Sequence, residues 1–188
     1  MSTSDTATAE APVLPLWIRA IDKLSDAFAV LAKWALLLAC VISGGNAIVR
    51  YVIGVSSNGW LEIQWYLFGA GVMLGAAQVL RLNEHVRVDL LYGSWKPKGQ
   101  VALDIFGLVA FLVPVTAIMA YLSWYPFLHM FVSGEVSSND GGLIRWPAMG
   151  LLPLGFALVL LQGCAEIGKR ILWLQNRAAL PNYERPLQ

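Results

Sequence analysis

Residues 152–161 read LPLGFALVLL and contain no ionisable or amide side chain. They lie inside an apolar stretch that runs from about 146 to 167, and a helix needs roughly 20 apolar residues to cross the ~30 Å core of a bilayer. Three further sections have the same aliphatic character: ALLLACVI at 35–42, GVMLGAA at 71–77 and FLVPVTAI at 111–118. These sections lack the strict alternation of membrane-barrel strands. The sequence therefore predicts an all-α integral membrane protein.

The composition of the whole chain supports the same class. Of the 188 residues, 57% are hydrophobic and 13% are charged, whereas soluble domains carry about 25% charged residues. The net charge of +1 gives no basic field that would attract nucleic acid. Four transmembrane helices are expected at about 27–49, 60–80, 101–124 and 146–167. They form a membrane domain over 14–175, preceded by a disordered tail at 1–13 and followed by a cytoplasmic tail at 176–188.

Lys and Arg residues predict the orientation, because they are in excess in cytoplasmic loops. Most of them lie in the N-terminal flank, in the connection after the second span and in the C-terminal flank. The other two connections offer only Arg50 and Arg145. Both termini are therefore expected in the cytoplasm.

The stretch before the first span, LPLWIRAIDKLSDAF at 14–28, has apolar residues at spacings of three and four and charged residues on the opposite side. This pattern is typical of an amphipathic helix that lies in the membrane interface. The alternative is that the stretch extends the first transmembrane helix into the cytoplasm. We favour the interfacial helix.

Polar residues inside a span are functional candidates, because they are costly in lipid. Asn46 follows two glycines in the outer half of the first span, which favours a role in helix packing over a substrate role. Glu62 lies in the first turn of the second span, where a carboxylate interacts favourably with the helix dipole. A salt bridge from Glu62 to another chain is the alternative. Gln64 and Trp65 follow in the same turn.

The sequence offers no evident site for transport or catalysis. A carrier in its own right needs an ionisable or carbonyl-rich site near the membrane midplane, and the midplane sections here are almost wholly aliphatic. His85 and His129 are expected on opposite membrane faces, so they cannot share a metal or bracket a haem. We expect no catalytic residue, metal or cofactor, and interpret the chain as a scaffold. Two alternatives are a membrane anchor for a respiratory haem or quinone enzyme and an autonomous exporter of small cations.

Residues 83–93, NEHVRVDLLYG, follow the second span and concentrate ionisable groups. Their apolar residues fit either an extended segment with alternating faces or a short amphipathic helix. We favour the helix, because lipid does not tolerate open strand edges. One His among carboxylates and arginines favours ion pairing over metal binding. Glu84, Arg87 and Asp89 are therefore interpreted as polar contacts to a partner.

The order of motifs resembles one family. WLEIQWYLF at 60–68 is followed by GAAxxLRxNEHVRVDLLY at 75–92, then by a basic stretch and a third span with Asp104 near its start. The stretch 134–163, GEVSSNDGGLIRWPAMGLLPLGFALVLLQG, adds to the similarity, which covers roughly 15–175. The chain resembles the small membrane subunit of tripartite ATP-independent periplasmic (TRAP) transporters, the DctQ-like family.

The resemblance implies a non-catalytic subunit in the bacterial inner membrane. It would form a heterodimer with a separate large subunit that carries solute and Na⁺, while a periplasmic binding protein delivers an organic acid. Solute identity would reside in those partners, with a lean towards a monocarboxylate or a 2-oxo acid. Candidate contacts with the large subunit are Asn46, Glu62, Gln64, Trp65, Glu84, His85, Arg87 and Asp89.

The connection between the third and fourth spans, about 129–145, is long for a loop without function. It contains Glu135, Asp140 and Arg145 and faces the compartment of the binding protein in the expected orientation. We expect it to form part of the docking surface. The alternative is an ordinary solvated loop with turn residues at 139–142.

Overall fold

The computed structural model describes residues 14–55, 57–83 and 96–177. All of the long secondary-structure elements in these residues are helices. The helices are α1 (Leu16–Ile53), α2 (Asn58–Leu82), α4 (Pro97–Gly107), the π-helical turn η1 (Leu108–Leu112), α5 (Val113–Ser133) and α6 (Trp146–Leu174). α4, η1 and α5 follow one another without a break. The described residues thus contain four helices long and apolar enough to cross a membrane. The prediction of an all-α fold with four spans is confirmed.

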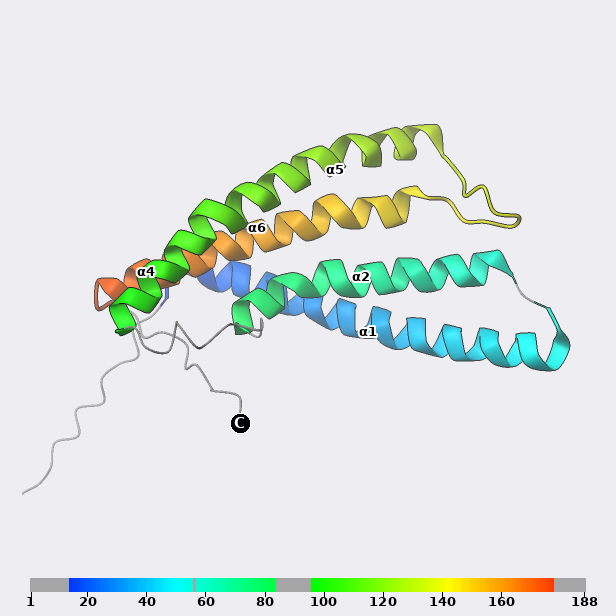
Figure 1. The fold of residues 1–188 in the computed structure, drawn as a ribbon, viewed down its shortest axis with the longest axis horizontal. Coiled ribbons are helices and arrows are strands. Elements are labelled where there is room, and N and C mark those ends of the chain that lie inside the picture. The colour runs from blue at the N-terminus through cyan, green and yellow to red at the C-terminus, as the bar shows by residue number, and fades with distance from the viewer. Residues whose placement is uncertain (1–13, 56, 84–95, 178–188) are drawn as a thin grey trace, which may run out of the picture.

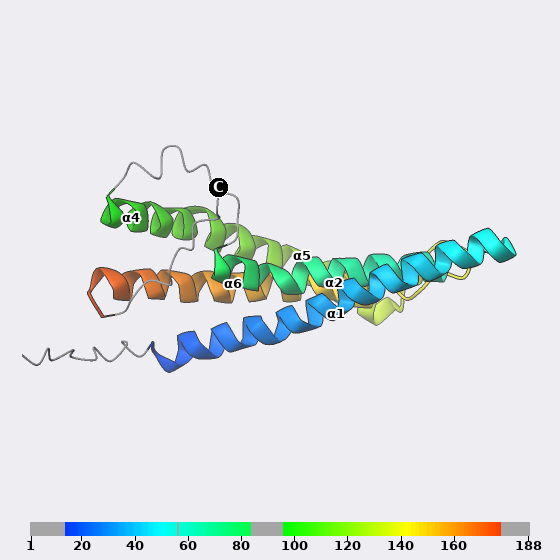
Figure 2. The ribbon, with the colours of Figure 1, turned by 90° about the horizontal axis from the view of Figure 1, so that it is seen from below.

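The four helices lie in a row at one end of the molecule, in the order α5, α6, α2 and α1 (Figure 1). We call this the hairpin end, because α1 joins α2 there and α5 joins α6. The opposite end, where α1 begins and α6 ends, is called the terminal end. Seen edge-on, α1, α6 and α4 spread apart at the terminal end (Figure 2). The molecule is therefore flat at the hairpin end and deeper at the terminal end.

The stretch before the first span does not form a helix of its own. α1 is one helix of 38 residues, about 57 Å long at 1.5 Å per residue. The expectation of a separate interfacial helix is corrected: the stretch is the beginning of α1, as in the alternative. The physical reason is a continuous stripe on α1 that packs against other helices. Its buried members are Ile18, Ser25, Ala29, Ala32, Ala35 and Ala39.

These small residues recur at spacings near 3.5, which keeps one face of α1 turned towards its neighbours. They let α1 approach other helices closely, as small residues do in membranes. Ala32 packs with Leu74 and Ala77 of α2 and Leu158 of α6 in the apolar core. A close approach also joins α2 and α6, where a Cβ on Gly155 would lie 2.7 Å from the Cβ of Met73.

The third spanning helix is longer than predicted. It continues to Ser133, about two turns beyond the expected end near Trp124. His129, expected just beyond this span, therefore lies within α5 and is exposed. The connection between α5 and α6 shortens to residues 134–145, which we call the α5–α6 hairpin.

Candidate functional site

The terminal end contains a network of polar side chains from α1, α2, α4 and α6. We call it the polar cluster, and its members are Asp22, Ser25, Asp26, Gln78, Arg81, Asp104, Gln162, Glu166, Lys169 and Arg170. Most of its α6 members are spaced three or four residues apart, which places them on one face of the helix. The cluster therefore forms where one polar face of α6 meets polar side chains of helices that are distant in the sequence.

Gln162 is the centre of the part between α1 and α6 and is fully buried. Its Oε1 accepts a hydrogen bond of 2.7 Å from the hydroxyl of Ser25. Its Nε2 donates to Asp22 Oδ1 at 3.0 Å and to Glu166 Oε1 at 3.1 Å. A buried amide is costly when it lacks partners, and here both ends of the amide are satisfied. Gln162 thus fixes the register of α1 against α6.

Buried charges surround this amide. Lys169 Nζ donates to Asp22 Oδ1 and to Glu166 Oε1, each at 2.7 Å. Arg170 pairs with Glu166 Oε2 at 2.7 Å and with Asp104 Oδ2 at 3.1 Å. Glu166 is only 3% exposed and has a cation on each carboxylate oxygen. Buried charges persist only when they are paired in this way.

A second arm of the polar cluster joins α2 to α1. Arg81 Nη1 pairs with Asp26 Oδ2 at 2.5 Å and donates to the backbone carbonyl of Asp22 at 3.0 Å. Gln78 Nε2 donates to Asp26 Oδ1 at 3.1 Å. The cluster therefore connects α1, α2, α4 and α6 at one end of the molecule. Its carboxylates are paired with cations, so its chemistry is that of a structural clamp.

The sequence reading did not identify the polar cluster. Its lysine and arginine members belong to the positive residues that predict the orientation, and no local pattern joined them to carboxylates on other helices. The spacing of Gln162, Glu166 and Arg170 by four residues was the available signal, since it aligns three polar side chains along one face of an apolar helix. In the described residues, no group of three or more His, Cys, Asp or Glu side chains could hold a metal ion.

The α5–α6 hairpin is a folded structure. An antiparallel bridge joins Val136 and Ile144. The amide of Ser137 donates to the carbonyl of Leu143 at 2.9 Å, and the amide of Arg145 donates to the carbonyl of Glu135 at 3.0 Å. The chain turns at Gly141, whose φ of 70° lies in the left-handed region that glycine adopts without strain. The hairpin therefore has a defined shape.

Glu62 attaches this hairpin to α2. Its carboxylate accepts hydrogen bonds from the hydroxyl of Ser137, from Asn139 Nδ2 at 2.7 Å and from the amide of Leu143 at 2.8 Å. Asn58 Nδ2 adds a bond of 3.0 Å to the carbonyl of Asp140. Glu62 thus has partners within its own chain, which neither sequence interpretation had foreseen. Its role in a subunit contact stays a prediction.

The charged residues expected to dock a binding protein lie on the hairpin and are accessible. Glu135 and Arg145 form an ion pair of 2.6 Å in which both side chains are at least a third exposed. Asp140, which lies between them in the sequence, is also exposed. All three residues lie on the α5–α6 hairpin, but only Glu135 and Arg145 are in contact. Their docking role stays a prediction.

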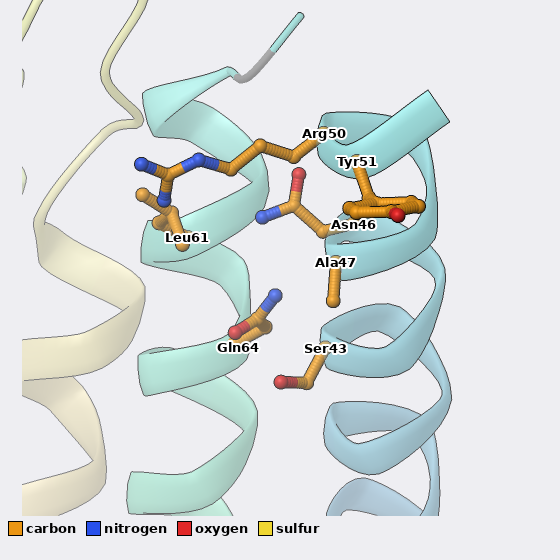
Figure 3. Close-up of a pocket in the computed structure, with 7 residues that line it drawn as sticks. All are labelled: Ser43, Asn46, Ala47, Arg50, Tyr51, Leu61 and Gln64. Atoms are coloured by element: carbon orange, nitrogen blue, oxygen red, sulfur yellow. The ribbon is translucent and has the colours of Figure 1, made fainter. Parts of the chain in front are cut away.

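Asn46 and Gln64 lie on opposite sides of a groove between α1 and α2 at the hairpin end, with Ser43 and Arg50 (Figure 3). Trp65, the neighbour of Gln64, is 77% exposed. The remaining candidate contacts lie outside the described residues; they are Glu84, His85, Arg87 and Asp89. The prediction of a helix over 83–93 likewise concerns residues that are almost all outside the described part of the chain.

Comparison with known proteins identifies the family. Residues 38–172 match the model of the DctQ component of tripartite ATP-independent periplasmic transporters. No curated protein and no solved structure matches the chain. The matched region includes the second, slightly smaller part of α1, from residue 38 onwards, and all of α2, α4, α5 and the hairpin, together with nearly all of α6. This multi-pass membrane chain belongs to the DctQ component family of the tripartite ATP-independent periplasmic transporters, whose members are small transporter subunits.

Proposed function

We propose that this chain is a non-catalytic small permease subunit that supports a separate large membrane subunit. The large subunit carries the solute and Na⁺, and a periplasmic binding protein delivers the solute, an organic acid. One observation supports this division of labour most strongly. Ionisable side chains with partners gather in the polar cluster and at the α5–α6 hairpin, whereas the core between α1, α2 and α6 is apolar.

The architecture is suited to a supporting role. A carrier needs an element with two arrangements, but the polar cluster clamps four helices through buried ion pairs. The flat row of helices leaves large apolar side chains exposed on both edge helices, such as Leu37 and Val41 on α1 and Ile118 and Leu122 on α5. In a membrane such surfaces contact lipid or another helical protein.

The orientation follows from the positive residues. Both termini are cytoplasmic, and the chain lies in the bacterial inner membrane. The polar cluster then lies at the cytoplasmic side, and the α5–α6 hairpin faces the periplasm. The hairpin is held by Glu62 and presents Glu135, Asp140 and Arg145, which supports its role as part of the surface that the binding protein contacts.

The solute is an organic acid, with a monocarboxylate or a 2-oxo acid favoured over a sugar acid. Its specificity resides in the binding protein and the large subunit. Subunit contacts are proposed at Glu62 and Trp65 on α2 and at Glu84, His85, Arg87 and Asp89 between α2 and α4. Asn46 and Gln64, the remaining candidates, line the groove between α1 and α2.

Co-purification tests this proposal. The tagged chain is expressed with the large subunit in the native membrane and extracted in mild detergent. A much larger polytopic protein should elute with it in a stable complex. Recovery of the chain only by itself, or as a homodimer that transports solute, would contradict the proposal, as would haem absorbance in the purified complex.

A further inference from the structure

A groove separates α1 and α2 at the hairpin end. It has a volume of about 530 Å³, and its walls include Ser43, Asn46 and Arg50 on α1 and Leu61 and Gln64 on α2. Arg50 extends from α1 across towards Leu61, with the amide of Asn46 below it (Figure 3). The amide of Gln64 lies deeper, on the side facing Ser43 (Figure 3). Polar side chains from two helices thus point into one space.

These side chains lack partners within the part of the chain that the structure describes. Gln64 Nε2 is buried and has no hydrogen-bond partner there. The side chains of Asn46 and Arg50 form no hydrogen bond or ion pair with described residues either. Glu62, one half-turn away on α2, has donors on both carboxylate oxygens. A buried donor without an acceptor is costly, so the groove is built to receive an acceptor.

The chemistry of the walls defines that acceptor as an anion. Arg50 carries a permanent positive charge and five N–H donors in a planar fork that matches phosphate. The buried NH₂ group of Gln64 points towards the space between α1 and α2 (Figure 3). Asn46 adds a second amide. A cation would be repelled by Arg50, whereas a phosphate and the carbonyl oxygens beneath it would satisfy all three donors.

The depth of the groove restricts the ligand further. Arg50 lies one turn before the end of α1 at Ile53, close to the membrane surface. Ser43 lies seven residues earlier on the same face, about 10 Å deeper at 1.5 Å per residue. Exposed Tyr51 is an aromatic residue of the kind that lies at headgroup level. The ligand therefore has an anionic head at the surface and an apolar part that reaches into the hydrocarbon.

We propose that this groove binds a diacyl phospholipid from the leaflet at the hairpin end. Arg50 holds the phosphate, and Asn46 and Gln64 donate hydrogen bonds to the ester carbonyls. An acyl chain continues past Ser43 and Ala47, where the wall is small and open. This inference rests on the membrane-spanning helices and does not depend on the transport role.

Native mass spectrometry of the full-length chain in mild detergent tests the site. The probes are phosphatidylglycerol, a diacylglycerol with the same acyl chains, and inorganic phosphate. Wild type should retain one phosphatidylglycerol about tenfold more tightly than diacylglycerol, because only the former offers a charge-assisted bond to Arg50. Inorganic phosphate at millimolar concentration should not displace the lipid, which separates a headgroup site from a free-phosphate site.

Two variants and a matched control identify the residues. Arg50→Gln and Gln64→Leu should each weaken retention of phosphatidylglycerol severalfold to tenfold. Arg19→Gln removes another exposed arginine of the same helix, outside the groove, and should leave retention unchanged. Far-ultraviolet circular dichroism checks that each variant keeps the helicity of wild type.

Three results would overturn the proposal. The first is equal retention of diacylglycerol and phosphatidylglycerol, and the second is an Arg50→Gln variant that binds lipid like wild type. The third is a cross-link from position 50 to a carboxylate of a co-purified protein in a complex that lacks the lipid. Each of these leaves co-purification with a large subunit untouched, so the two proposals fail separately.

Discussion

At the terminal end, buried ion pairs and amides join α1, α2, α4 and α6, whereas at the hairpin end the carboxylate of Glu62 and the amide of Asn58 join α2 to the α5–α6 hairpin. The members of the polar cluster are paired with one another. The hairpin end leaves an open groove with unpaired donors and an exposed ion pair. The difference indicates that the terminal end maintains the fold, while the hairpin end offers surfaces to other molecules.

The largest expected effect comes from the terminal end. Glu166→Leu leaves the ammonium of Lys169 and the guanidinium of Arg170 with fewer partners in a buried site. Breaking a buried ion pair costs about 3–5 kcal/mol, so the free energy of unfolding in mixed micelles should fall by a similar amount. Glu135→Gln, which breaks an exposed pair, is the control and should cost less than about 1 kcal/mol. Equal effects of the two changes would remove the distinction between the ends.

Glu62→Leu should produce the next largest effect, limited to the hairpin end. It removes the acceptor of the Leu143 amide and of the Asn139 side chain, which costs about 1–3 kcal/mol locally. Hydrogen exchange should accelerate in residues 134–145 and stay unchanged around Gln162. Glu62→Gln keeps one acceptor oxygen and should show an intermediate rate. Faster exchange at both ends would mean that the two ends are coupled.

The third effect concerns the segment that follows α2, which we expect to bind the large subunit. Arg87→Ala and Asp89→Ala should each weaken the complex with the large subunit by about tenfold, or about 1.4 kcal/mol, if they belong to the minority of interface residues that carry most of the binding energy. Titration of the tagged large subunit in detergent measures this affinity. Lys98→Ala, at the start of α4, is the control. Wild-type affinity in both variants would show that the segment is an ordinary solvated connection.

The smallest effect is expected from charges on the hairpin surface. Glu135→Lys combined with Asp140→Lys should lower uptake severalfold, because rim charges mainly affect the rate of encounter. Assembly with the large subunit should remain intact, and the loss should shrink as salt is added. Unchanged uptake at low salt would count against docking at this loop.

Local periodicity explains which parts of the fold could be predicted. The four spans followed from apolar stretches such as 152–161, since hydrophobic length is a local property of the sequence. The continuity of α1 was missed, because its charged N-terminal turns resemble those of an interfacial helix. The feature that extends α1 is the stripe of small buried residues that includes Ser25 and Ala32. Counting charged and apolar residues does not reveal such a stripe.

The polar contacts were less predictable because they join distant residues. Ser25 and Gln162 are 137 positions apart, and Glu62 meets Leu143 at a separation of 81. Glu62 alone fitted a dipole-stabilising group or a salt bridge to another chain, and no local pattern pointed to its partners on the hairpin. Asn46 and Gln64 were identified singly as candidates, but only the packing of α1 on α2 places them in one groove with Arg50.

Reconstituted transport tests the central claim most directly, namely that this chain supports transport without performing it. Proteoliposomes should contain this chain alone, the large subunit alone, or both, with the binding protein, an inward Na⁺ gradient and a labelled organic acid. We predict uptake only when both membrane chains are present. Uptake by this chain alone, or equal uptake by the large subunit with and without it, would contradict the claim.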